Sequence, residues 1–233
     1  FGFSQSANEK IQSYLNNNGM KLNLSKGGIK DWVIKSETSS ETTGINNYYV
    51  KQTYNGIVIY QSAIYFWIKN GEIINKPEGF IQNVASKVNA TVPGISVTEG
   101  MKVVLSQLGE KPFRSSIIEK DKNRFKLTND NLTEDHIRAE LVYFETDSNE
   151  LELAWQYEFY SQDTKHLWSV FIDALKGKLL EKRDLVISCN FGTRSPKSDE
   201  SANQSNLFTK TFLKNHNQVS IVALTPGTTN YRV

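Results

Sequence analysis

The stretch Tyr49-Val50-Lys51-Gln52-Thr53-Tyr54-Asn55-Gly56-Ile57-Val58-Ile59-Tyr60 decides how the first half of this chain folds. Two runs rich in Tyr, Val and Ile flank Asn55-Gly56, a dipeptide that accepts the positive φ angles of a two-residue hairpin turn. We therefore expect two antiparallel strands, at 45–54 and 57–69, joined by a tight reversal. Asn70-Gly71 repeats this turn chemistry and predicts a further short strand directly after it.

The strand expected at 57–69 carries large apolar side chains on both of its faces. One face would hold Val58, Tyr60, Ile64, Phe66 and Ile68, and the other Ile57, Ile59, Tyr65 and Trp67. A helix should cover one face of an antiparallel meander. The opposite face must then be covered at least in part, either by the rest of the chain or by a separate partner.

Two capping-box patterns predict two helices. Ser6-Ala7-Asn8-Glu9 opens a helix expected at 6–18, and Ser96-Val97-Thr98-Glu99 opens one at 97–108. Gly19 and Gly109 are expected to end these helices in the left-handed conformation. After the second helix we expect six strands, at about 113–119, 125–128, 138–146, 151–160, 166–174 and 178–183.

The order of a helix followed by a sheet occurs twice, and no alternation of strands and helices indicates a doubly wound parallel sheet. We therefore predict an α+β fold of two tandem units, each a helix packed on an antiparallel β-sheet as in cystatin-like folds. The expected boundaries are 1–80 and 95–188 for the two units and 81–94 for their join. A flexible linker at 189–218, rich in small, polar and charged residues, leads to a C-terminal strand within 219–233.

Composition excludes several classes of protein. Among 233 residues the formal net charge is only +2, which argues against nucleic-acid binding by bulk charge. Cys189 is the single cysteine, so an internal disulfide and a cysteine-rich zinc site are ruled out. No apolar run reaches the roughly 18 residues of a membrane span. The opening Phe1-Gly2-Phe3-Ser4-Gln5 fits either the last residues of an export signal or an ordinary ragged end.

No catalytic pattern is present in the sequence, and we predict that this segment is not an enzyme. The three histidines lie far apart and are expected on the surface or in satisfied contacts: His136, His166 and His216. Three glutamates alternate with apolar residues, as on a solvated sheet face: Glu140, Glu152 and Glu158. Phosphate-binding glycine motifs and signatures of a nucleophilic cysteine are also absent.

Aromatic residues gather on the first meander. They either form its core and cross-strand pairs or make an exposed docking surface, because Tyr and Trp are favoured in both settings. The candidates for contact with a partner are Tyr49, Tyr54, Tyr60, Tyr65 and Trp67.

These residues resemble a known family. Gln52-Thr53-Tyr54-Asn55-Gly56, the β-branched strand after it and Asn70-Gly71 resemble the FTP motif of fungalysin and thermolysin propeptides. The helix at 97–108, the strand at 151–157 and the run 168–180, with a Trp, an Asp-Ala pair and a turn Gly, resemble a PepSY-type segment. The tail 225–233 is similar to the opening of the mature peptidase in bacterial fungalysins, and a thermolysin-type precursor is the second choice.

The resemblance implies a secreted propeptide that assists the folding of a zinc metalloendopeptidase and temporarily inhibits it. The peptidase would follow in the same precursor and begin within 219–233, zinc would belong to it, and cleavage would fall in the linker. Trp168 would be a core residue, Asp173 a turn residue, and Cys189 either a zinc-binding cysteine switch or an ordinary strand-end cysteine. A free-standing inhibitor on the same scaffold and an enzyme with an unrecognised site are the alternatives.

Overall fold

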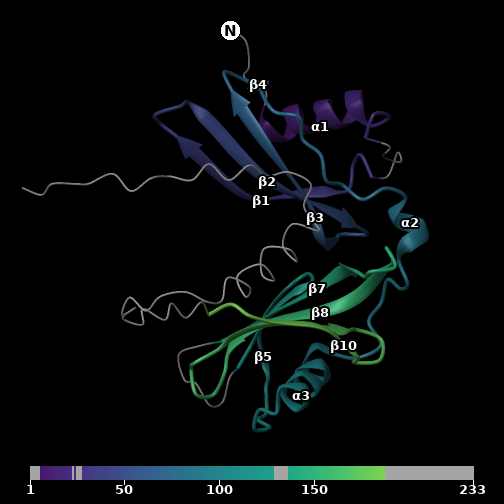
Figure 1. Ribbon diagram of the computed structural model, residues 1–233, viewed down its shortest axis with the longest axis vertical. Coiled ribbons are helices and arrows are strands. Elements are labelled where there is room, and N and C mark those ends of the chain that lie inside the picture. The colour runs from purple at the N-terminus through teal and green to yellow at the C-terminus, as the bar shows by residue number, and fades with distance from the viewer. Residues whose placement is uncertain (1–5, 23, 25–27, 129–135, 187–233) are drawn as a thin grey trace, which may run out of the picture. The chain divides into compact units, whose positions relative to one another are not determined.

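The computed structural model describes residues 6–22, 24, 28–128 and 136–186. These residues form an α+β fold in which a large mixed sheet is accompanied by few helices (Figure 1). The helices are α1 (Ala7–Asn18), α2 (Val84–Lys87) and α3 (Val97–Leu108). The strands are β1 (Trp32–Ser40), β2 (Ile45–Tyr54), β3 (Ile57–Lys69), β4 (Glu72–Ile73), β5 (Ile117–Asp121), β6 (Arg124–Leu127), β7 (Ile137–Glu145), β8 (Leu151–Tyr160), β9 (Leu167–Asp173) and β10 (Leu179–Asp184). None of the helices in the described residues is long and apolar enough to cross a membrane.

The described strands form one sheet, with the order β1-β2-β3-β7-β8-β9-β10 along its main path. β4 pairs with β3, and the hairpin of β5 and β6 adds to β7. Neighbouring strands are antiparallel except β3 and β7, which run parallel over two residue pairs, Val58 with Val142 and Ile59 with Tyr143. The predicted hairpin turns are confirmed, because Asn55 and Asn70 both have a φ of 50°.

Helix α1 packs on one face of the β1–β4 meander. Ile11 and Leu15 lie one turn apart and are fully buried against Ile64 and Phe66 of β3. The predicted capping box is present, since the Ser6 hydroxyl accepts from the Glu9 amide at 3.3 Å and the Glu9 carboxylate accepts from the Ser6 amide at 2.9 Å. Two backbone donors that the helix leaves free are thereby satisfied.

Gly19 does not end α1 in the left-handed conformation, so that expectation was wrong. Its φ is −52° and its ψ −41°, which is ordinary right-handed helix. A Cβ at this position would lie 2.5 Å from Cδ1 of Ile29, so the glycine here lets the Ile29 side chain pack closely against the end of the helix. Gly109, by contrast, has a φ of 70° and ends α3 as predicted.

Helix α3 packs on the sheet formed by β7 to β9. Met101 and Val104 are fully buried, and the hydroxyl of buried Tyr157 donates to the carbonyl of Val97 at 2.8 Å. A Cβ at Gly100 would lie 2.2 Å from that hydroxyl, so this glycine allows the helix to approach the sheet closely. The same apolar cluster also contains Ile57 and Ile59 from the first part of β3.

The buried side chains of Gln52 and Ser62 fasten the loop after β4 to the meander, since the Ser62 hydroxyl donates to the Gly79 carbonyl at 3.1 Å. Gln52 on β2 is fully buried, and its carbonyl oxygen accepts from the Ser62 hydroxyl and from the Ile81 amide, both at 2.7 Å. Its amide nitrogen donates to the Ile81 carbonyl at 2.9 Å. The register of β2 and β3 shifts at this point, between Lys51 and Thr53. Gln52 thus satisfies both backbone groups of Ile81, which lies in the loop after β4.

The strand expected at 113–119 is displaced, which corrects that boundary. β5 begins at Ile117 and continues to Asp121, and the turn into β6 places Lys122 at a φ of 52°. The bounds of β5 follow from this turn and from its pairing with β6, and the strand does not begin at Phe113 as expected. Phe113 instead packs against the cluster under α3.

Replacing Gln52 by Leu should lower the free energy of unfolding by about 2 to 4 kcal/mol. Leu has a similar volume, but it leaves the amide and the carbonyl of half-buried Ile81 without their partner. Urea unfolding of the full chain measures the change. The matched control is Gln107→Leu on the exposed side of α3, which should stay within about 0.5 kcal/mol of the wild type. Equal effects of the two substitutions would contradict a structural role for Gln52.

Candidate docking surface

The outer face of β2 and β3, opposite α1, carries exposed aromatic side chains. Phe66 points toward α1 and is buried, so its strand neighbours Tyr65 and Trp67 point the other way, with exposed fractions of 52% and 47%. Tyr49 lies opposite Tyr65 in the register of the two strands, and their ring centroids are 5.0 Å apart. We call Tyr49, Tyr65 and Trp67 the aromatic face.

Asn75 holds the backbone under this aromatic face. Its side-chain oxygen accepts from the Trp67 amide at 3.0 Å, and its amide nitrogen donates to the Tyr65 carbonyl at 2.6 Å. The Ile74 amide adds a bond to the Trp67 carbonyl at 2.9 Å. Asn75 therefore continues the pairing that β4 begins, and it keeps the two exposed rings on an ordered strand. Sequence reasoning assigned this residue only to a strand end and missed its role.

Lys51 lies beside the aromatic face, in a desolvated position. Its ammonium nitrogen is 5.4 Å from the ring centroid of Tyr49 and 5.2 Å from that of Tyr60, and it donates to the Tyr60 carbonyl. Burial, reinforced by the nearby Lys35 ammonium and opposed by Glu140, lowers the pKa of Lys51 to about 8. Burial, with the neighbouring tyrosines, raises the pKa of Tyr49 to about 12. A charge is therefore costly on this part of the surface.

The other two docking candidates are covered by other parts of the protein. Tyr60 is half-buried, and its ring packs against Phe171 and Phe144 with centroids 4.5 Å and 6.4 Å away. Tyr54 packs against the cluster under α3 and meets the ring of Tyr143 edge-on at 6.1 Å. The structure thus brings three of the five candidates together on one open face. The role of all five in docking stays a prediction.

Charged groups of the described residues pair at the surface. Lys35 bonds to Glu140 at 2.9 Å, and Arg138 approaches Glu158 at 3.2 Å. Glu152, the third alternating glutamate, is half-buried on β8. Within the residues that the structure describes, no three His, Cys, Asp or Glu side chains are grouped so that they could hold a metal ion.

The predicted histidine and turn residues are placed as follows. His166 bonds to Asp184 at 2.6 Å, which raises the pKa of His166, and its ring stacks on Trp168 with centroids 5.0 Å apart. Trp168 is partly buried and packs against the cluster under α3.

The Asp173 carboxylate accepts from the amides of the two turn residues after Ala174, at 2.8 and 3.2 Å. His136 is exposed just before β7. His216, Cys189, the linker at 189–218 and the end at 219–233 lie outside the described residues.

The comparisons with known proteins add little to this geometry. No protein-family profile matches the chain, and no curated protein sequence matches it either. A solved structure similar to it is the Bacillus megaterium YpeB C-terminal domain, with a TM-score of 0.36 and 11% sequence identity over 80% of this chain and 68% of that one. At that TM-score the likeness carries no argument about function.

The free energy of unfolding of the wild type, minus that of a Lys51→Met variant, should increase with pH between about pH 8 and 10.5. In this window the folded state has released the Lys51 proton, whereas the unfolded chain still holds it, so the unfolded state binds more protons. Urea unfolding of both proteins at a series of pH values gives the difference directly. Lys69→Met, at the exposed end of β3, is measured in parallel as the control. A Lys51 difference that does not change with pH would refute the prediction.

Proposed function

We propose that this chain is the propeptide region of a secreted zinc metalloendopeptidase, which it helps to fold and temporarily inhibits. The observation that carries the proposal is the aromatic face, in which Tyr65 and Trp67 are exposed and Tyr49 is half-buried beside them on an ordered sheet. Aromatic side chains bury large areas with little loss of side-chain freedom and dominate the energy of many protein interfaces. A rigid surface of this kind suits both templating and inhibition by docking.

The FTP and PepSY resemblance gives the partner in this proposal. α1 with β1 to β4 would correspond to the FTP unit at 1–80, and α3 with β5 to β10 to the PepSY unit at 95–188. This tandem, cystatin-like interpretation is supported by separate apolar clusters under the two helices. A fungalysin-type precursor is the first choice and a thermolysin-type precursor the second. Processing would occur within 189–218, and zinc would reside in the peptidase.

A free-standing inhibitor is the alternative that uses the same surface. The aromatic face requires a partner but no covalent link to it, so the geometry fits both arrangements. The reading frame after residue 233 separates the two. A His-Glu-x-x-His helix encoded there supports the propeptide, because its two histidines bind zinc on one helical face and the glutamate acts as base. A stop codon supports the free-standing inhibitor.

Adding the full chain to its separately produced peptidase domain should speed refolding of that domain and inhibit its activity. Trp67→Ala should weaken inhibition roughly tenfold or more, because this ring is expected to be buried on docking. Tyr160→Ala, which removes another exposed aromatic ring, with an exposed fraction of 38%, should leave inhibition unchanged. Refolding yield and residual peptidase activity are the two measurements.

Two outcomes would count against this proposal in different ways. No effect of the wild-type chain on either refolding or activity would refute the propeptide function. Normal inhibition by Trp67→Ala together with Tyr65→Ala would keep the function but place the contact away from the aromatic face.

Replacing Cys189 by Ser in the precursor tests the cysteine switch. If a Cys189 thiolate binds the catalytic zinc, the variant precursor should show peptidase activity before any cleavage. Activity is measured on the uncleaved precursor with a peptide substrate, and gel analysis verifies that it is intact. Unchanged latency would identify Cys189 as an ordinary cysteine and leave inhibition to the docked surface.

A further inference from the structure

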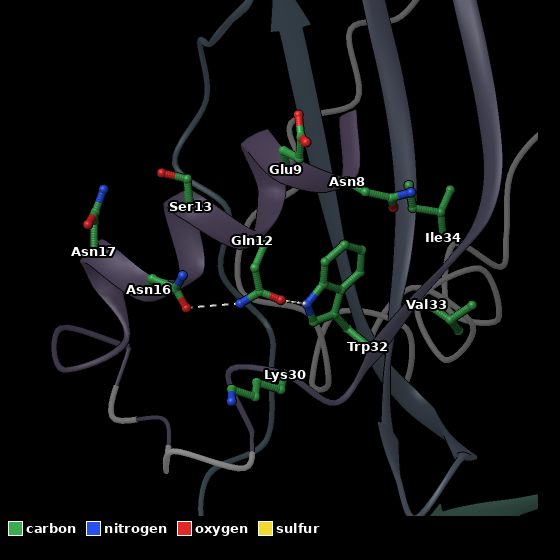
Figure 2. Close-up of a pocket in the computed structure, with 10 residues that line it drawn as sticks. All are labelled: Asn8, Glu9, Gln12, Ser13, Asn16, Asn17, Lys30, Trp32, Val33 and Ile34. Atoms are coloured by element: carbon green, nitrogen blue, oxygen red, sulfur yellow. Dashed lines mark hydrogen bonds between the residues drawn. The ribbon is translucent and has the colours of Figure 1, made fainter. Parts of the chain in front are cut away.

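A groove of about 670 Å³ lies between the polar side of α1 and the start of β1 (Figure 2). Its helical wall carries Asn8, Gln12 and Asn16, which follow one another at intervals of four residues and so share one side of the helix. Its other wall is the beginning of β1, from Trp32 to Ile34. The groove is therefore bordered by side-chain amides on one side and by a strand on the other.

The floor of the groove is held in place by Gln12. Its side-chain oxygen accepts from the indole nitrogen of Trp32 at 3.1 Å, and its amide nitrogen donates to Asn16 at 2.9 Å and to the Ile29 carbonyl at 3.1 Å. Figure 2 shows the Trp32 ring standing between the helix and the strand, with its nitrogen turned to Gln12. The groove is thus preformed and does not need to be opened by a ligand.

Strand β1 ends the main path of the sheet, and its outer edge borders this groove. Among the described strands, β1 pairs with β2 alone, and the Thr53 amide donates to the Asp31 carbonyl at 2.9 Å. Asp31 and Thr53 are thus a hydrogen-bonded pair, and such pairs alternate with non-hydrogen-bonded pairs along antiparallel strands. Trp32 and Ile34 therefore belong to non-hydrogen-bonded pairs, and their backbone N–H and C=O groups point away from β2. The free edge therefore offers donors and acceptors in the spacing of another strand.

We propose that this groove binds an extended, uncharged polypeptide segment, which adds to the free edge of β1 as a further strand. The backbone of such a segment would pair with Trp32 and Ile34, and its outer peptide groups would face the amides of Asn8 and Asn16. Side-chain amides offer both donors and acceptors, as peptide groups do. This binding site is independent of the aromatic face, which lies on the outer surface of β2 and β3.

Charge and length define the segment further. The charged lining residues are one acid, Glu9, and one base, Lys30, so the lining has no formal net charge. It therefore favours neither an acidic nor a basic segment. The helical wall from Asn8 to Asn17 extends roughly 14 Å at 1.5 Å per residue. A strand rises about 3.3 Å per residue, so four to five residues, on the order of a pentapeptide, fill the groove.

The test uses the full chain and a capped pentapeptide of alternating threonine and valine, which is neutral and favours the extended conformation. Nuclear magnetic resonance titration should show saturable shifts of the Ile34 amide and the Trp32 indole N–H, with a dissociation constant of about 1 mM or lower. The Trp155 indole, which donates to the Ile95 carbonyl under α3, is the internal reference and should not move. An analogue N-methylated at every backbone amide should not bind, because it cannot pair with a strand.

Matched variants locate the site. Ser13→Trp fills the groove from α1 and should weaken binding at least roughly tenfold. Ser106→Trp places the same bulk on the exposed side of α3 and should bind as the wild type does. The spectra themselves verify that both variants are folded.

Several results would overturn the proposal. They are the absence of shifts with the pentapeptide, equal binding of the N-methylated analogue, and binding that Ser13→Trp leaves intact. Chitotetraose, a neutral sugar that also carries amide groups, is titrated in parallel. Saturable binding of this sugar without binding of the pentapeptide would assign the groove to a glycan instead.

Discussion

One strand belongs to two hydrophobic clusters, and the arrangement of the described residues depends on it. β3 is 13 residues long. Its first part contributes Ile57 and Ile59 to the cluster under α3, and its second part contributes Ile64 and Phe66 to the cluster under α1. The strand can serve both because it pairs with β2 along most of its length and with β7 over two residue pairs. Side chains reinforce this short parallel contact, since Gln61 bonds to both backbone groups of Glu145 at 2.8 and 3.0 Å.

The same constraint decides which surface stays open. The face of β3 opposite α1 needs a cover, and the cluster under α3 supplies one only for the first part of the strand. Tyr65 and Trp67, farther along, remain half exposed on an ordered backbone. Nearby, Lys51 and Tyr49 lie where charge is disfavoured, as the direction of both pKa shifts indicates. An open aromatic surface on which a charged side chain is costly is suited to contact with a protein partner, and this is the basis of the proposed function.

The groove beside α1 offers a ligand a different kind of interaction. Its strand wall offers unpaired backbone groups, whereas the aromatic face offers apolar area. Backbone pairing depends weakly on side-chain identity, and aromatic burial depends strongly on shape. The two surfaces therefore suit different tasks, capture of an extended segment in one case and selective docking of a folded partner in the other.

Local chemistry along the chain was sufficient to predict many elements. The bounds of β2, β3, α3 and β8 agree with expectation, and both capping boxes and both Asn-Gly turns are present. These features depend on residues a few positions apart, which a sequence displays directly. The tertiary structure alone decided that Ile57 is buried while Tyr65 is exposed, that Ile29 packs closely against Gly19, and that Asn75 supports the aromatic face. Each of these outcomes depends on which distant segment packs against the residue, and the parallel contact of β3 with β7 brings together residues more than eighty positions apart.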